Sequence, residues 1–203
     1  MTRDEEANII RAVLDGNPNA FDDLVLAYQD QVYHIALRMT GNEEDAFDLS
    51  QETFLKAYRS LKSFRGESAF GTWLYRLASN LCIDFLRKQK RRGGGQAVSL
   101  DEETEWRPRE LPDLRYEPQE ALERKELRER VRAGLARLPE EQRLILVLRD
   151  AEGLSYEEIG AVLAIEQGTV KSRIFRARAR LAKLLTEDGN FFGGPSSKVR
   201  KGR

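Results

Sequence analysis

The sequence has little of what disulfides and metal sites require. Its 203 residues include one cysteine, Cys82, and one histidine, His34. One cysteine cannot form an internal disulfide, and these two residues alone cannot supply a tetrahedral zinc site. Cys82 stands between two apolar residues and is expected to be a buried structural thiol. These absences favour a reducing, cytoplasmic setting, and we expect no metal, cofactor or catalytic residue.

Long hydrophobic runs are also missing. No apolar stretch approaches the roughly 18 residues that a membrane span needs, and the acidic start "MTRDEEANII" lacks the layout of a signal peptide. The sequence shows neither a glycine loop for phosphate nor a nucleophile motif, so it predicts that the protein is not an enzyme.

An excess of one charge is missing as well, since 34 basic residues balance 34 acidic ones. This balance argues against a uniformly basic nucleic-acid binder, but charge is distributed unevenly. Every ionisable residue from Lys171 to Lys183 is basic, whereas residues 93–118 hold seven acidic and three basic residues. Local fields decide what a surface attracts.

Apolar residues recur at helical three- and four-residue steps, and no stretch alternates as a strand would. The sequence therefore predicts an all-α fold of two small helical domains. Residues 1–92 form the first, a four-helix unit. Asn17 and Ser68 are expected to cap helices, and Asn42 to cap another after a break at Gly41. The predicted buried stripe of the last helix is Phe70, Trp73, Leu77, Leu81 and Phe85.

The remaining boundaries follow from composition. Three glycines open residues 93–118, which hold prolines among acids and are expected to form a flexible acidic linker. Residues 119–186 form the second predicted domain, and residues 187–203 are expected to be a flexible basic tail.

The second domain contains "GLSYEEIGAVLAIEQGTVKSRIFRARARLAKLL", which predicts a helix-turn-helix. Ser155 and Glu158 have the spacing of a capping box before a short helix. The turn places Ala164 where a positive φ is expected, which glycine would tolerate better. The next helix has an apolar inner face and a basic outer face.

This pattern suits duplex DNA, because a helix fits the major groove and its early residues reach base edges. A basic helix is by itself usually only a solvated face, but here it follows a capping box, a short helix and a tight turn. The candidate DNA-binding residues are Gln167, Thr169, Lys171, Ser172, Arg173, Arg176, Arg178 and Arg180.

The chain resembles the extracytoplasmic-function (ECF) sigma factors of bacterial RNA polymerase, the group-four branch of the sigma family. Three stretches carry the resemblance: "DLSQETFLKAYRSLKSFRG", "SAFGTWLYRLASNLCIDFLRK" and "LPEEQRLILVLRDAEGLSYEEIG…GTVKSRIFRARARL". It covers about residues 5–92 and 119–185. The resemblance implies that the first domain is sigma region 2, which binds and opens the promoter −10 element. It implies that the second is region 4, which reads the −35 element in the duplex.

The resemblance also implies partners. They are the polymerase core, through the clamp coiled coil and flap of its large subunits, promoter DNA, and an anti-sigma factor that is often membrane-bound. Asp48, Gln51 and Glu52 fall on the core-docking motif. Independently, Asp45, Asp48 and Glu52 lie at i, i+3 and i+7 and form one acidic stripe. A stress or envelope response is the expected context.

Base capture is placed by the resemblance in the loop of residues 64–69 and the helix after it. There an aromatic face, a glycine and small side chains could receive an unstacked base. The −10 candidates are Lys56, Arg59, Phe64, Arg65, Glu67, Ser68, Ala69, Tyr75, Arg76 and Asn80. Arg87, Lys88 and Arg91 are candidate contacts to upstream phosphates. Phe70 is expected in the core, whereas Tyr75 lies off the predicted stripe and is expected to be accessible to DNA.

Alternatives remain open from the sequence. A stand-alone helix-turn-helix regulator would bind duplex DNA without polymerase, and a helical adaptor would bind protein only. The acidic linker suggests a further hypothesis, in which it occupies a positively charged channel of the polymerase until RNA displaces it.

Overall fold

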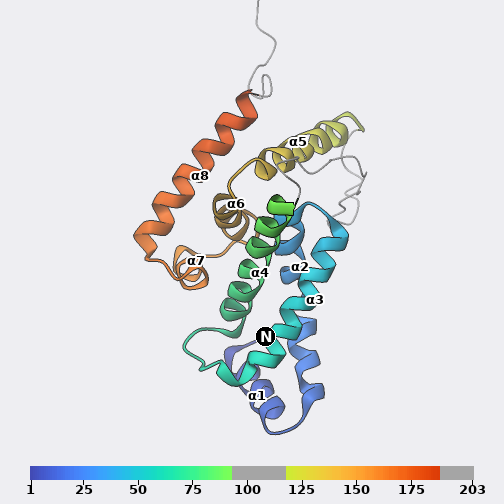
Figure 1. Ribbon diagram of the computed structural model, residues 1–203, viewed down its shortest axis with the longest axis vertical. Helices are drawn as coiled ribbons and strands as arrows, with labels where there is room; N and C mark the ends of the chain where they lie inside the picture. The colour runs from blue at the N-terminus through green and yellow to red at the C-terminus, as the bar shows by residue number, and fades with distance from the viewer. Residues whose placement is uncertain (93–117, 188–203) are drawn as a thin grey trace, which may run out of the picture.

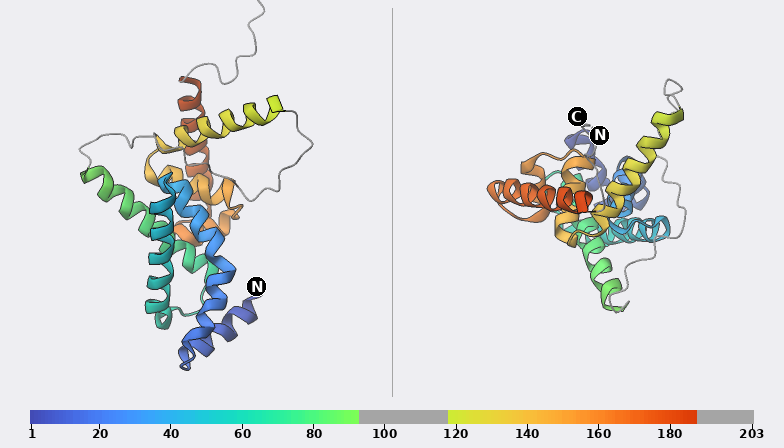
Figure 2. Two further views of the ribbon diagram at one scale, coloured as in Figure 1. Left: turned by 90° about the vertical axis from the view of Figure 1, so that its right-hand side faces the viewer. Right: turned by 90° about the horizontal axis from the view of Figure 1, so that it is seen from above.

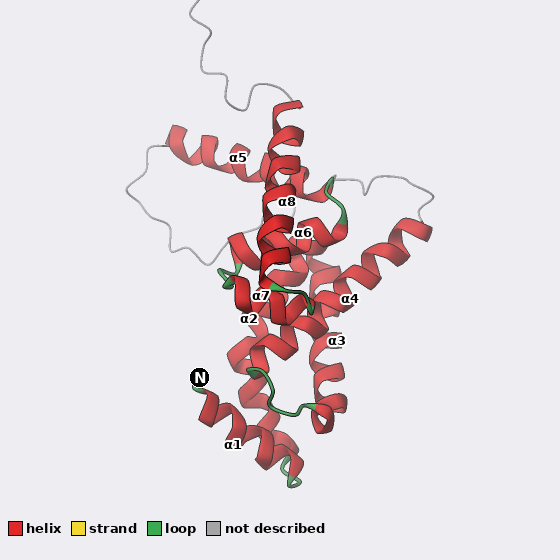
Figure 3. Ribbon diagram, turned by 90° about the vertical axis from the view of Figure 1, so that its left-hand side faces the viewer, coloured by secondary structure: helices red, strands yellow, loops and turns green. Residues whose placement is uncertain are grey.

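A computed structural model describes residues 1–92 and 118–187, and within these ranges every element is a helix (Figures 1 and 3). The all-α prediction is confirmed. The first half comprises α1 (Arg3–Leu14), α2 (Phe21–Thr40), α3 (Glu43–Ser60) and α4 (Phe70–Arg92). The second comprises α5 (Pro118–Ala136), α6 (Glu140–Leu146), α7 (Tyr156–Leu163) and α8 (Gln167–Glu187). The predicted linker and tail lie almost wholly outside the described residues.

Short helical turns join some of these helices. Two 3-10 turns, Pro18–Ala20 and Leu61–Ser63, precede α2 and follow α3. A π-helical turn, Val147–Ala151, extends α6.

Two of the predicted helix caps are wrong. Asn42 caps α3 as expected, accepting from the Asp45 backbone N–H at 2.9 Å after the left-handed Gly41. Asn17, however, makes no side-chain capping bond. The Ser68 hydroxyl donates to the Ala69 carbonyl oxygen at 3.3 Å instead of receiving a bond from α4.

The first half has a core of its own, in which α4 packs against α1, α2 and α3. Phe70, Leu74 and Ala78 of α4 lie in this core, and the buried line on α4 continues with Cys82 and Leu86 in a second cluster. Of the predicted stripe, Phe70 is fully buried, whereas the other four residues are partly buried and pack against the hydrophobic clusters. Leu74, also expected in the core, is fully buried. A four-residue step stays on one face of a straight helix only approximately, so neighbouring helices decide which apolar line is covered.

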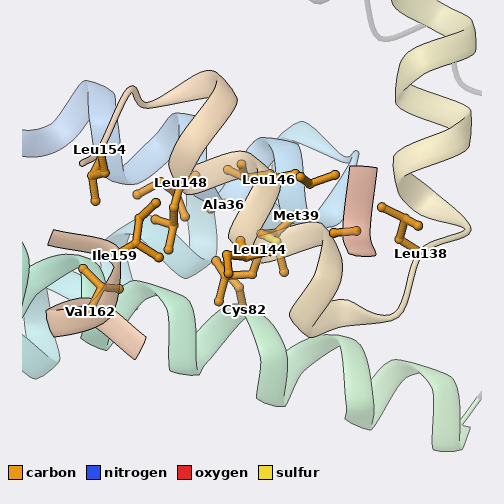
Figure 4. Close-up of a cluster of buried hydrophobic side chains, with 14 of the residues drawn as sticks. Ala36, Met39, Cys82, Leu138, Leu144, Leu146, Leu148, Leu154, Ile159 and Val162 are labelled. Atoms are coloured by element: carbon orange, nitrogen blue, oxygen red, sulfur yellow. The ribbon is translucent and has the colours of Figure 1, made fainter. Parts of the chain in front are cut away.

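A second cluster joins the two halves, and we call it the shared core (Figure 4). It includes Met39 from α2, Cys82 from α4, Leu144 from α6 and Ile159 from α7, each at most 1% exposed. In Figure 4, Cys82 points from α4 toward Leu144. The expected pair of domains is thus packed together around common hydrophobic residues, which is the strongest term available for holding helices together.

Polar contacts reinforce this packing. Arg38 of α2 forms an ion pair with Glu152, and the buried Arg143 of α6 donates to the Met39 carbonyl oxygen. α4 lies between α2 and α3 on one side and α6 and α7 on the other (Figure 1). α5 and α8 extend away from this packed body in different directions (Figure 2).

Candidate nucleic-acid interface

The helix-turn-helix is built as its sequence predicts. Ser155 accepts from the Glu158 backbone N–H at 3.1 Å, and the Glu158 carboxylate accepts from the Ser155 backbone N–H at 2.7 Å. Ala164 ends α7 in the left-handed region at φ 54°. A Cβ at Gly160 would lie 2.8 Å from the Ile165 carbonyl oxygen, so the chain turns tightly between α7 and α8.

α8 buries its inner face and leaves the predicted DNA-binding residues outside. Val170, Ile174 and Ala177 are at most 2% exposed. Among the candidates, Gln167, Lys171, Ser172, Arg176, Arg178 and Arg180 are exposed, and Thr169 and Arg173 are partly buried. The arrangement presents a polar, cationic row on one projecting helix.

Two of these arginines contact acids of the same half. Arg178 is held by both carboxylate oxygens of Asp150, and Arg173 lies 3.8 Å from Glu141. The hydrogen bond to Asp150 raises the pKa of Arg178. Such exposed ion pairs contribute little to stability, so phosphates could replace the acids.

The predicted base-capture loop, residues 64–69, is the exposed connection before α4. Gly66 adopts φ 71°, which glycine tolerates best. Arg65, Glu67 and Ala69 are exposed, whereas Ser68 is partly buried.

Phe64 does not present a free flat face. Its ring packs against Phe70 and Trp73, with centroids 5.8 and 5.3 Å away. It remains partly exposed. The loop is therefore anchored at its first residue by aromatic packing.

Tyr75 and Arg76 lie against the second half, which the sequence did not reveal. Tyr75 is partly buried, and burial raises its pKa to about 12, with the carboxylate of Glu152 adding to the shift. Arg76 donates to the backbone carbonyl oxygen of Ala161 in α7. The expectation that Tyr75 is freely accessible to DNA is wrong for this packed arrangement.

The other −10 candidates are exposed but spread along the first half. Asn80 lies about 15 Å along α4 from Phe70, at 1.5 Å per residue, and makes no hydrogen bond to the loop within the described part of the chain. The structure therefore does not bring Asn80 back to the loop as expected. Lys56 and Arg59 are exposed on α3.

The basic end of α4 touches the second half only loosely. Arg87 lies 3.2 Å from Glu141, while Lys88 and Arg91 are exposed. Because the Arg87–Glu141 pair is more than half exposed on both sides, solvent screens it strongly.

The predicted core-docking residues share a face of α3 with apolar side chains that sequence reasoning missed. Asp48, Gln51 and Glu52 are exposed. Phe47 and Leu55 flank Gln51 at four-residue steps and are 57% and 54% exposed. The spacing of the sequence could have predicted this apolar surface. Residues at i, i+4 and i+8 of a helix share one face, and these positions are Phe47, Gln51 and Leu55.

Residues 1–92 and 118–187 hold no group of three His, Cys, Asp or Glu side chains that could bind a metal ion. None of the helices described there is both long and apolar enough to cross a membrane. Cys82 is buried as expected, and burial raises its pKa to about 12.

Two family models match the chain. Sigma-70 region 2 matches residues 24–92, and Sigma-70 region 4 matches residues 128–181. The chain is 39% identical over 186 residues to the RNA polymerase sigma-H factor of Pseudomonas aeruginosa, covering 91% of this chain and 96% of that protein. It is 41% identical over 170 residues to the ECF RNA polymerase sigma-E factor of Escherichia coli K12, covering 84% and 88%.

Solved structures agree. CnrH, in complex with the cytosolic domain of CnrY, matches with a TM-score of 0.65 and 28% identity, covering 91% of this chain and 99% of CnrH. The sigma factor RpoE of Bartonella quintana, in complex with the anti-sigma factor NepR, matches with a TM-score of 0.61 and 27% identity, covering 83% and 98%. With relatives matched over most of their length and both sigma regions in order, this chain belongs to the ECF sigma factors, DNA-binding factors of promoter-specific transcription initiation.

Proposed function

We propose that the protein delivers RNA polymerase core to a particular promoter class by dividing recognition between its halves. α8 reads the −35 element in the major groove, while residues 64–69 and α4 capture a base of the −10 strand during opening. The observation that carries this is the pairing of a complete helix-turn-helix with an exposed, glycine-bearing loop in one chain. Gln167, Thr169, Lys171 and Ser172 begin α8, where base edges are within reach.

Within this division, the residues have distinct roles. Arg176, Arg178 and Arg180 lie further along α8 and contact phosphates, as Arg87, Lys88 and Arg91 do upstream of the −10 element. Because Asn80 lies far along α4 from the loop, it contacts the strand at a different nucleotide from the loop. Each aromatic contact to an unstacked base would contribute about 1–3 kcal/mol.

Docking on polymerase core uses the exposed face of α3. Asp48 and Glu52 supply charge for a basic partner helix, and Gln51 a hydrogen-bonding group. Phe47 and Leu55 supply apolar area that desolvates on contact, which is where interface energy is concentrated.

The packed arrangement is the form that must open before promoter binding. Arg76 is bonded to α7, and Tyr75 beside it is partly buried, so both become fully available to DNA only after the halves separate. An anti-sigma protein that holds the packed form would keep the factor inactive. The similar sigma factor RpoE has been solved with the anti-sigma factor NepR, and CnrH with the cytosolic domain of CnrY. A stress or envelope signal that removes this partner fits the proposal.

Run-off transcription with purified core on a promoter library tests the proposal. We expect initiation from a restricted promoter set. In Phe64→Ala and Asn80→Ala we expect lost opening, read by permanganate reactivity, with core binding retained. Sequence-specific duplex binding without any transcription from core would overturn the proposal in favour of a stand-alone regulator.

A further inference from the structure

Helix α1 contacts the loop of residues 64–69, although no candidate residue lies on it. It precedes the region 2 match, which begins at residue 24. Figures 1 and 3 show α1 beside the end of the molecule where the loop enters α4. Two side chains of α1, Arg3 and Glu6, make the contact.

Glu6 is a buried carboxylate, 6% exposed, held by two donors from different helices. The backbone N–H of Phe70, the first residue of α4, donates to Glu6 Oε2 at 3.2 Å. The Tyr28 hydroxyl donates to Oε1. Glu6 therefore caps the N-terminus of α4, which Ser68 does not. A carboxylate is a favourable acceptor there, because the helix dipole is positive at its N-terminus.

The Tyr28 ring of α2 also packs against the start of α4. A Cβ added at Gly71 would lie 2.8 Å from Tyr28 Cε1, so α2 approaches the α4 backbone closely at the second residue of the helix. Burial, with the hydrogen bond to Glu6, raises the pKa of Tyr28. The place where the loop ends is thus set by α1 and α2 together.

Arg3 holds the middle of the same loop. Its Nη2 donates to the carbonyl oxygen of Gly66 at 3.2 Å, and both groups are exposed. Gly66 is the residue with φ 71° that turns the loop. A hydrogen bond at this carbonyl restrains the most flexible residue of the segment.

We infer that Arg3 and Glu6 are positioning residues for base capture, because they hold residues 64–69 in the shape that receives an unstacked base. The inference rests on the proposed function of the loop. Phe64 is anchored by aromatic packing, Gly66 by Arg3, and Phe70 by Glu6. A loop fixed at three points before binding loses less conformational entropy when the base arrives, which strengthens binding.

The test uses holoenzyme formed with the full chain and a fork-junction fragment of a promoter selected by run-off transcription. Its −10 strand is single-stranded, and matched fragments carry one abasic site at each −10 position in turn. Arg3→Ala is compared with Arg11→Ala, which removes the same charge from an exposed site on α1 whose side chain makes no hydrogen bond or ion pair within the described chain. Glu6→Gln, which removes the charge and one of the two carboxylate acceptors, is compared with Glu5→Gln, which affects only the capping box of α1.

For wild-type holoenzyme, removing the captured base is expected to weaken binding about fivefold or more. Arg3→Ala is expected to weaken binding to intact DNA about three- to tenfold, the range for one hydrogen bond. On the fragment that lacks the captured base, its affinity is expected to equal that of wild type. Glu6→Gln should behave likewise, and both controls should match wild type throughout. Because Arg3 is exposed, its variant keeps the fold even where Glu6→Gln does not.

One result overturns the inference alone, namely that Arg3→Ala retains the wild-type sensitivity to base removal. This result has two forms. Either the affinity of the variant is unchanged for both fragments, or it falls equally for intact and abasic DNA, which would make Arg3 an ordinary phosphate contact. If wild-type binding is insensitive to every abasic site, the proposed base capture itself fails, and the inference fails with it.

Discussion

Separation of the two halves can be measured through Cys82, the sole cysteine. Its thiol is 1% exposed in the shared core, and burial raises its pKa from 9.0 to about 12. Burial therefore both shields the sulfur from reagents and disfavours the reactive thiolate, so the packed form should react far more slowly than an exposed thiol. Labelling by an aromatic disulfide reagent should therefore report the fraction of molecules that have opened.

The perturbation is Glu152→Arg, which places a second cation against Arg38 at the junction of the halves. The Glu152 side chain is 9% exposed, so the charge reversal acts where solvent screens weakly. We expect labelling at pH 8 to accelerate about a hundredfold or more, up to the rate of an exposed thiol, because removing one partner of a buried ion pair costs about 3–5 kcal/mol and raises the opened fraction accordingly. The double variant Arg38→Glu with Glu152→Arg should restore slow labelling, and polymerase core should accelerate labelling of wild type.

Asp150→Arg is the matched control, because it reverses a charge two residues away, within the π-helical turn that Glu152 follows, but breaks only the Asp150–Arg178 pair inside the second half. It should leave the labelling rate near that of wild type. The reasoning is refuted if wild-type Cys82 already reacts as an exposed thiol, or if Asp150→Arg accelerates labelling as much as Glu152→Arg does.

Two further predictions concern stability. Arg143, 8% exposed, donates to the carbonyl oxygens of Leu135, Ala136 and Met39, so Arg143→Met should lower the free energy of unfolding by about 2–4 kcal/mol in urea titrations. Arg149→Met, which loses one hydrogen bond to Leu154 and a cation–π contact with Tyr156, should cost about 1–2 kcal/mol, and a loss as large as that of Arg143→Met would contradict this account. Ala164→Gly should raise the melting temperature of the second half, because glycine relieves a left-handed cost of about 1 kcal/mol, less its greater unfolded-state entropy. An unchanged or lower melting temperature would show that the strain at Ala164 does not exceed the entropy cost of glycine.

Short-range sequence patterns predicted the local structure well. The Ser155–Glu158 capping box and the Asn42 cap form over three residues, so their partners can be read from spacing alone. The inner face of α8 and the left-handed Ala164 follow from the same local rules. The polar row on α8 could be located for the same reason, since an amphipathic helix has only one outward face.

Contacts between distant segments were not predictable in this way. Glu6 caps α4 although it is 64 residues away in the sequence, whereas local spacing predicted Ser68 as the cap. Arg76 meets Ala161 across 85 residues, which moved Tyr75 and Arg76 from an open surface to a covered one.

The sequence by itself determined the helices, their order, the two sigma regions and the cationic face of α8. The tertiary structure alone decided which line of α4 is buried, that the halves share one core, and that α1 holds the loop of residues 64–69. The physical reason is the distance along the chain over which each kind of interaction acts. Helix periodicity and capping depend on neighbours three or four residues away, whereas burial depends on which surfaces meet after the chain has folded.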